Sequence, residues 1–176
     1  MKHLIVGPAG HGVTEYALGL ARATGAEVIR EETFGDTPLA GPVHVTFTDH
    51  LFGDTAERLL ARIDGPLSVS LHDIPQPEEG AERYARRAGV YRELVEKADV
   101  AVVNSEHEAS FFDAATTVIR LPIPVIDSPF DPEPGSVGVL GFLYPGKGHE
   151  DLIAALPDHR LRFLGAVSKG HETWAE

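Results

Sequence analysis

The chain has 176 residues, of which 27 are acidic and 15 basic, so its formal net charge is −12. A chain this acidic lacks the basic field that binds a nucleic-acid backbone, and we expect neither DNA nor RNA as a partner. There is no cysteine, which excludes disulfides, zinc–thiolate sites and thiol nucleophiles. Hydrophobic residues make up 43% of the chain, enough for the core of one domain, or of one domain and part of another.

The hydropathy pattern predicts no membrane segment. The apolar run near the N-terminus covers only residues 4–6, which is too short for the core of a signal peptide. No apolar run approaches the ~20 residues that a membrane-spanning helix needs. We therefore expect a cytoplasmic protein.

Apolar runs alternate with segments of helical periodicity along residues 1–126. Strands are predicted at residues 3–7, 27–32, 43–48, 67–73, 100–105 and 118–124. Helices are predicted at residues 13–24, 54–64, 78–98 and 105–115. This alternation predicts an α/β fold with a parallel sheet and helices on both faces.

Several helix ends have their own signals. Gly25 suits the end of the first helix, because glycine readily adopts the left-handed conformation found there. Asp54 or Thr55 is a suitable cap for the second helix. Ser105 is a suitable cap for the fourth helix, and Glu108 stands three residues later, at the spacing of a capping box.

A linker is predicted at residues 127–136, DSPFDPEPGS, which hold three prolines, three acids and a glycine. Beyond it, residues 137–143, 147–157 and 161–167 predict a strand, a helix and a strand. We therefore predict a first domain at residues 1–126 and an incomplete second one at residues 137–176. Forty residues are close to the lower limit for independent folding, so we expect this second unit to rest on other residues or on another chain.

Polar residues and glycines follow the predicted strands, and ligands bind at the carboxyl ends of strands in parallel α/β sheets. The loop at residues 7–12, GPAGHG, follows the first strand. Other candidates follow later strands: His72 and Asp73 after the fourth, Asn104 and Ser105 after the fifth. The tetrapeptide Lys-Gly-His-Glu occurs at residues 147–150 and again at 169–172, which adds Lys147, Gly148, His149 and His171.

The glycine loop differs from two known nucleotide-binding loops. Its order is G-x-x-G-x-G, whereas the dinucleotide fingerprint reads G-x-G-x-x-G. Gly7, Gly12 and Thr14 match the spacing of a P-loop, but Val13 stands where that loop has its lysine. Two interpretations stay open: a turn without a ligand, or a loop that presents the N–H groups of residues 10–12 to an anion.

The segment GFLYPGKGHEDLIAAL, residues 141–156, resembles the segment that opens the second Rossmann-like domain of family 4 glycosyltransferases of the GT-B fold. That family commonly has Gly-Arg, a spacer, Lys-Gly and a helix of the type D-L-L-I-x-A. The glycine loop, the His72–Asp73 pair and VVNSEHEASFF at residues 102–112 are also similar to family segments. Phe142 departs from the pattern, because the family has arginine there.

The resemblance implies a Rossmann-like domain on the acceptor side, followed by the start of a donor-side domain. It implies transfer of a sugar from a nucleotide-sugar donor to an acceptor, with no metal and no other cofactor. His72 and Asp73 would be catalytic. The donor phosphates would meet Gly10, His11, Gly12, Lys147 and Gly148. Asn104, Ser105, His149 and His171 are possible contacts of donor or acceptor.

In the family, a pair of glutamates and most of the nucleotide pocket lie further along the sequence than residue 176. We therefore expect this chain to be inactive alone. Two alternatives stay open: a non-catalytic binding module that kept the fold, and a different nucleotide-binding α/β enzyme. The apolar strands of residues 137–176 predict exposed edges, and hence a homodimer through this unit.

Overall fold

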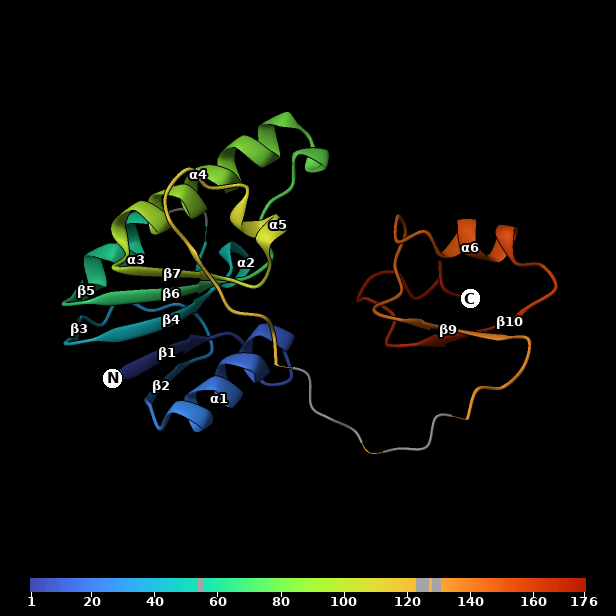
Figure 1. The fold of residues 1–176 in the computed structure, drawn as a ribbon, viewed down its shortest axis with the longest axis horizontal. Coiled ribbons are helices and arrows are strands. Elements are labelled where there is room, and N and C mark those ends of the chain that lie inside the picture. The colour runs from blue at the N-terminus through green and yellow to red at the C-terminus, as the bar shows by residue number, and fades with distance from the viewer. Residues whose placement is uncertain (54–55, 123–126, 128–130) are drawn as a thin grey trace. The chain divides into compact units, whose positions relative to one another are not determined.

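The computed structural model describes residues 1–53, 56–122, 127 and 131–176, and the chain divides into two compact units, residues 1–123 and 124–176 (Figure 1). Some predictions fall outside the described residues: the cap at Asp54 or Thr55, the end of the sixth strand, the domain boundary at residue 126 and part of the linker.

The first unit contains a six-stranded parallel sheet in the order β2-β1-β4-β6-β7-β8. Its strands are β1 (Lys2–Val6), β2 (Glu27–Glu31), β4 (Val43–Phe47), β6 (Leu67–Leu71), β7 (Val100–Val103) and β8 (Thr117–Val118). Helix α1 lies on one face of the sheet, and α3 and α4 lie on the other (Figure 1). This arrangement confirms the predicted α/β, Rossmann-like fold class.

The helices of this unit are α1 (Gly12–Thr24), α2 (Asp49–Phe52), α3 (Glu57–Arg62), α4 (Ala81–Lys97) and α5 (Glu106–Ala109), and a 3-10 turn precedes α4 at Pro77–Glu79. Helix α1 ends as predicted at Gly25, whose φ of 64° is left-handed. Ser105 caps α5 as predicted, because its Oγ accepts the N–H of Glu108 at 3.1 Å. The Glu108 carboxylate accepts the N–H of Asn104, one residue earlier than a capping box requires.

The structure corrects several predicted elements. Helix α5 has one turn instead of residues 105–115, because Phe111 and Phe112 pack against the core and the chain continues in tight turns. Strand β8 has two residues, and Pro122 beyond it has no N–H to donate to a ladder. Helix α2 and the short parallel pair β3 (Leu39–Ala40) and β5 (Ile63–Asp64) were not predicted, because they are too short to show a period.

The second unit contains two parallel strands, β9 (Ser136–Leu140) and β10 (Arg160–Leu164), with helix α6 (His149–Ala155) between them in sequence. This confirms the predicted order of strand, helix and strand. None of the helices in the described parts of the chain is long and apolar enough to cross a membrane.

The main core lies between the sheet and the helices α3 and α4. Alternate residues of each strand point into it, as Leu4 and Val6 of β1 do together with Val45 and Phe47 of β4. Tyr91 and Leu94 of α4 are among the residues that cover these side chains, and they are almost completely buried. A smaller cluster joins Ile5 of β1 to Ala17 and Ala21 of α1.

The opposite face of the sheet is unusually polar. His3 Nε2 lies 2.9 Å from Thr46 Oγ1, and the ring of His3 meets the ring of His44 edge to face at 4.7 Å. The ring nitrogens of His44 lie 2.8 Å from Ser68 Oγ and 3.2 Å from Ser70 Oγ. Paired hydrogen bonds thus satisfy polar groups inside a parallel sheet, where apolar residues are the rule.

Burial is the main reason that the pKa values of His3, His44 and His72 are lowered to about 4, and the proximity of His44 contributes for His3, as that of His72 does for His44. All three imidazoles are therefore neutral in the fold at pH 7. In the unfolded chain they take up a proton below about pH 6.5. Between these two values the unfolded state binds more protons than the folded state, so acid favours unfolding.

We predict that the free energy of unfolding is highest above about pH 6.5 and falls as the pH is lowered. Below about pH 4 these histidines cause no further fall. Each histidine contributes up to about 3 kcal/mol to the fall, since its pKa differs between about 6.5 in the unfolded chain and about 4 in the fold, and one pKa unit corresponds to about 1.4 kcal/mol. Urea unfolding between pH 7.5 and 4.5 measures this. His44→Gln should flatten the pH dependence, whereas His107→Gln, at an exposed position, should leave it unchanged. Equal slopes in wild type and His44→Gln would contradict the prediction.

Candidate functional site

The strand order reverses between β1 and β4, and the loops that leave the carboxyl ends of these two strands therefore diverge. Ligands of open α/β sheets bind in the crevice that such a reversal creates. The glycine loop follows β1, and Thr48, Asp49 and His50 follow β4. The candidate site is accordingly built from these two loops and from the loop after β6.

The glycine loop makes a close turn into α1. Gly7 has a φ of 119°, and a Cβ atom there would lie 2.8 Å from Thr14 Oγ1. The Thr14 hydroxyl donates to the Val6 carbonyl at 3.3 Å, so it anchors the turn. The N–H of Gly10 donates to Glu15 Oε1 at 3.0 Å. The Glu15 carboxylate thus already accepts a hydrogen bond from one of the N–H groups that are predicted to bind the donor phosphates.

His11 connects this loop to α2. Its ring stacks on the ring of His50, with centroids 6.2 Å apart and an angle of 19° between the planes. Nδ1 of His11 is buried and has no hydrogen-bond partner among the described residues. The histidine predicted at the phosphates therefore stands beside a second histidine, which the sequence did not single out.

A cavity of about 230 Å³ opens beside His50. Its lining comes from the strand ends and from one face of α4: Asp49, His50, Asp73, Arg83, Arg86 and Arg87. Of these residues, only Asp73 was predicted as a site residue. Arg83, Arg86 and Arg87 have the spacing i, i+3 and i+4, which places them on one face of the helix. In the sequence, this arginine spacing and the Asp49-His50 pair after a buried strand are the two patterns that could have identified these lining residues.

Arg87 is the centre of this site. Its guanidinium binds Asp49 through two hydrogen bonds of 2.7 and 2.8 Å, and binds Glu79 at 2.6 Å and Asp73 at 3.0 Å. The side chain is only 5% exposed. Burial alone would raise the pKa of Asp49, but the hydrogen bonds and charge of Arg87 outweigh it and hold that pKa below its usual value. The hydrogen bonds from Arg87 to Asp49, above all, raise the pKa of Arg87 itself.

Asp73 has a φ of 54°, the only positive φ of a residue other than glycine in the described parts of the chain. Two groups of α4 hold its backbone: Arg87 Nη2 lies 2.8 Å from the Asp73 carbonyl oxygen and the Tyr91 hydroxyl lies 3.2 Å from it. The Tyr91 hydroxyl also lies 2.8 Å from the His72 carbonyl oxygen. Strained backbone conformations concentrate at functional sites. Here the strained conformation directs the exposed carboxylate of Asp73 toward the cavity.

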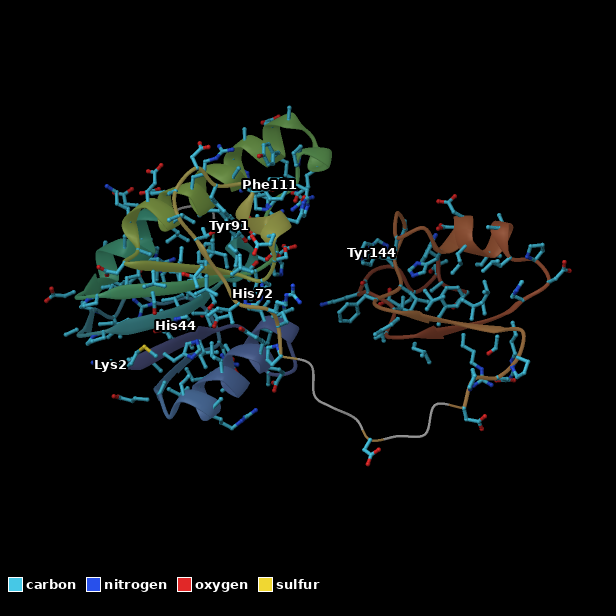
Figure 2. All side chains as sticks on the ribbon, viewed as in Figure 1. Lys2, His44, His72, Tyr91, Phe111 and Tyr144 are labelled. Atoms are coloured by element: carbon cyan, nitrogen blue, oxygen red, sulfur yellow. The ribbon has the colours of Figure 1, made fainter. Side chains whose placement is uncertain are left out.

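His72 lies next to Asp73 in sequence but has different neighbours. Its ring meets the ring of Tyr16, on α1, edge to face at 4.7 Å, and the side chain is 8% exposed. Nε2 of His72 is buried without a hydrogen-bond partner among the described residues. His72 and Tyr91 are labelled in Figure 2. The two predicted catalytic residues therefore share a strand end, but only Asp73 lines the cavity.

Asn104 and Ser105 serve the fold at the end of β7. Asn104 Nδ2 donates to the Leu71 carbonyl of β6 at 3.3 Å, and Ser105 caps α5. Neither residue lines the 230 Å³ cavity. The structure places both at the predicted edge of the sheet and gives their side chains structural partners.

In the second unit, the two Lys-Gly-His-Glu segments follow neighbouring parallel strands. The Ser168 N–H donates to the Leu143 carbonyl at 2.9 Å, which aligns the two loops. Lys147 Nζ lies 5.2 Å from the centre of the Tyr144 ring, and His171 lies 6.3 Å from the same ring. Gly148, with a φ of 76°, precedes α6.

His149 is buried in the second unit and packs against two aromatic rings. It meets Phe163 at 5.4 Å and Trp174 at 6.0 Å, and its Nδ1 has no partner among the described residues. This environment favours a packing role over the predicted contact with a ligand. No group of three or more acidic or histidine side chains in the described parts of the chain is arranged to hold a metal ion.

The fold and the cavity beside the carboxyl ends of β4 and β6 define a Rossmann-like α/β protein with a polar site of buried ion pairs. No protein-family model, no curated protein and no solved structure matches the chain.

We predict that Arg87→Met destabilises the first unit by about 3–5 kcal/mol, because it leaves the buried Asp49 carboxylate without its partner. Arg83→Met is the matched control on the same helix face. The Arg83 side chain is 65% exposed and pairs with Glu79 across one turn, so its loss should cost less than about 1 kcal/mol. Urea unfolding at pH 7 measures both values, and equal losses would contradict the central role of Arg87.

Proposed function

We propose that the chain belongs to a glycosyltransferase that takes a sugar from a nucleotide-sugar donor, with no metal or other cofactor, in the cytoplasm. The observation that carries the proposal is the His72–Asp73 pair at the carboxyl end of β6, where Asp73 has strained backbone and faces a cavity. The resemblance of residues 141–156 to the donor-side segment of family 4 supports the same function.

In this proposal Asp73 accepts a hydrogen bond from the hydroxyl of the sugar acceptor, or orients that hydroxyl, because its carboxylate is the exposed acid of the cavity. His72 is neutral and buried, and it would offer a ring nitrogen to the sugar. Lys147 would neutralise charge that develops on the leaving diphosphate. His72 and Asp73 would act from the first unit and Lys147 from the second, and each role suits the chemistry of the side chain.

We expect the 176-residue chain to bind one of UDP-glucose, GDP-mannose or ADP-glucose weakly, because most of the family's nucleotide pocket lies further along the sequence, and to show saturable changes in the amide NMR signals of residues 7, 9–12 and 147–150. Lys147→Ala should weaken binding about tenfold, the loss of one good charge-assisted contact. Lys97→Ala removes the same charge at the end of α4 and should have no effect. The absence of saturation with all three donors, or equal effects of the two substitutions, would refute the proposal.

A specific contact favours the second candidate function, a binding module without catalysis. The Glu15 carboxylate already occupies the Gly10 N–H, and Phe142 stands where the family has arginine, so two groups that would hold phosphate are compromised. If neither the wild type nor Glu15→Gln binds a nucleotide sugar, the module is the better description. Equal binding of free nucleotides and nucleotide sugars would instead favour another nucleotide-binding enzyme.

We also propose that the second unit associates with its counterpart in another copy of the chain. Leu140 is 88% exposed, Phe142 63% and Leu164 54%, so the carboxyl-terminal end of the β9–β10 pair presents an apolar patch. On the same face, Arg160 and Arg162 pair with Glu133 and make the other end polar. Among the described residues, no further strand pairs with the outer edges of β9 and β10. Bare apolar edges of this kind favour pairing between chains.

Sedimentation at micromolar concentration should show a dimer for the wild type. Leu140→Glu with Leu164→Glu should convert it to a monomer, because it places charges on the exposed apolar patch. Ile153→Glu, at an exposed position of α6, is the matched control and should leave the dimer intact. If the wild type stays a monomer at all concentrations up to about 100 μM, the proposed association is disproved, because a specific dimer should form below that concentration.

A further inference from the structure

A second cavity, of about 160 Å³, lies on the polar face of the six-stranded sheet. His3, His44 and Ser70 form its floor, and they come from three neighbouring strands. Tyr16 and Leu20 of α1 form one wall, and Val102 of β7 lies on the other side. None of the residues in this cavity has a predicted role in the proposed reaction.

The cavity exists because one helix covers only part of this face. Within the described residues of the first unit, α1 is the helix on this side of the sheet, and it packs against β1, β2 and β4 (Figure 1). The strands β6 and β7 continue beyond it. Val102 is 8% exposed even so, because the walls of the cavity shield it.

The floor is polar but carries no charge at pH 7. Burial lowers the pKa of His3 and His44 to about 4, so both rings are neutral. Both nitrogens of His44 are engaged, by Ser68 and by Ser70. A hydroxyl has one hydrogen to donate and two lone pairs, so Ser70 keeps hydrogen-bonding capacity beyond its contact with His44.

No lysine, arginine, aspartate or glutamate is among the described residues that line the cavity. An ionised ligand would therefore lose its hydration without gaining a counter-charge from the side chains that line the cavity, which is unfavourable. The volume is that of a single ring: an apolar cavity of about 150 Å³ in another protein binds benzene. Apolar walls with a hydroxyl and two imidazoles at the floor suit a ring that carries one polar group.

We propose that this cavity is a binding site for an uncharged, single-ring aromatic molecule with one hydrogen-bonding substituent. The ring would lie between Leu20 and Val102, and the substituent would reach the Ser70 hydroxyl. Tyr16 belongs to the cavity wall and its ring also packs against His72, so the ligand would touch a residue that supports the end of β6. The inference does not depend on the proposed transferase function.

Phenol is the probe, and the full 176-residue chain is titrated while the imidazole NMR signals of His3 and His44 are followed at pH 7. We expect saturable shifts of both signals with a Kd of about 1 mM, which is reasonable for a ligand of seven heavy atoms. Benzoate has the same ring with a negative charge and should bind at least tenfold more weakly. Benzoate binding as tight as that of phenol would overturn the inference, as would phenol shifts that never saturate.

Two substitutions on one strand locate the site. Val102→Phe fills the cavity and should abolish phenol binding. Val100→Phe adds the same ring on the same face of β7, outside the cavity lining, and should leave phenol binding unchanged. Identical binding by the two variants would contradict the assignment.

Ser70→Ala tests the polar contact if Val102→Phe does not fold. This variant should weaken phenol binding about fivefold to tenfold, the range of one neutral hydrogen bond. It should leave the binding of toluene, which has no hydroxyl, within twofold of the wild-type value. Equal losses for phenol and toluene, or no loss for either, would show that Ser70 does not hold the substituent and would overturn the proposal.

Discussion

The ion-pair network around Arg87 is the constraint on which the rest of the first unit depends. One guanidinium on α4 binds carboxylates that come from three separate places: Asp49 after β4, Asp73 after β6 and Glu79 in the 3-10 turn. Its burial means that each carboxylate must be in place, because an unpaired buried charge is far more costly than a paired one. The network therefore fixes the two strand ends and the start of α4 relative to one another.

The same network connects stability to the candidate site. Arg87 and Tyr91 stand one helical turn apart on α4, and both bind the backbone of Asp73. They hold this residue in a left-handed conformation that costs an aspartate about 1 kcal/mol or more. All three carboxylates bind Arg87, but that of Asp73 stays exposed in the cavity, whereas those of Asp49 and Glu79 are mostly covered. Three acids with similar chemistry thus have different roles, which burial and contacts assign.

The two faces of the sheet differ because side chains alternate along each strand. One face supplies Leu4, Val45 and Val69 to the core beneath α4. The other presents His3, His44 and Ser70, whose hydrogen bonds make a polar floor beside α1. In a parallel sheet with both faces covered, such positions are normally apolar. The polar face is therefore the feature that sets this protein apart from the general pattern of its fold. It supplies the buried histidines His3 and His44, which contribute to the predicted loss of stability in acid, and the floor of the second cavity.

The sequence by itself determined the alternation of strands and helices, the parallel α/β class and the edge of the sheet where the candidate site lies, because hydrophobic period and glycine positions are local properties. It also placed His72 and Asp73 together at the end of one strand, β6. Only the tertiary structure decided that Asp73 faces a cavity while His72 packs against Tyr16, and that Glu15 occupies the Gly10 N–H. It alone revealed Arg87 as the partner of Asp49, since these residues are 38 positions apart. Pairings over such distances arise from the packing of α4 on the sheet, which no local pattern encodes.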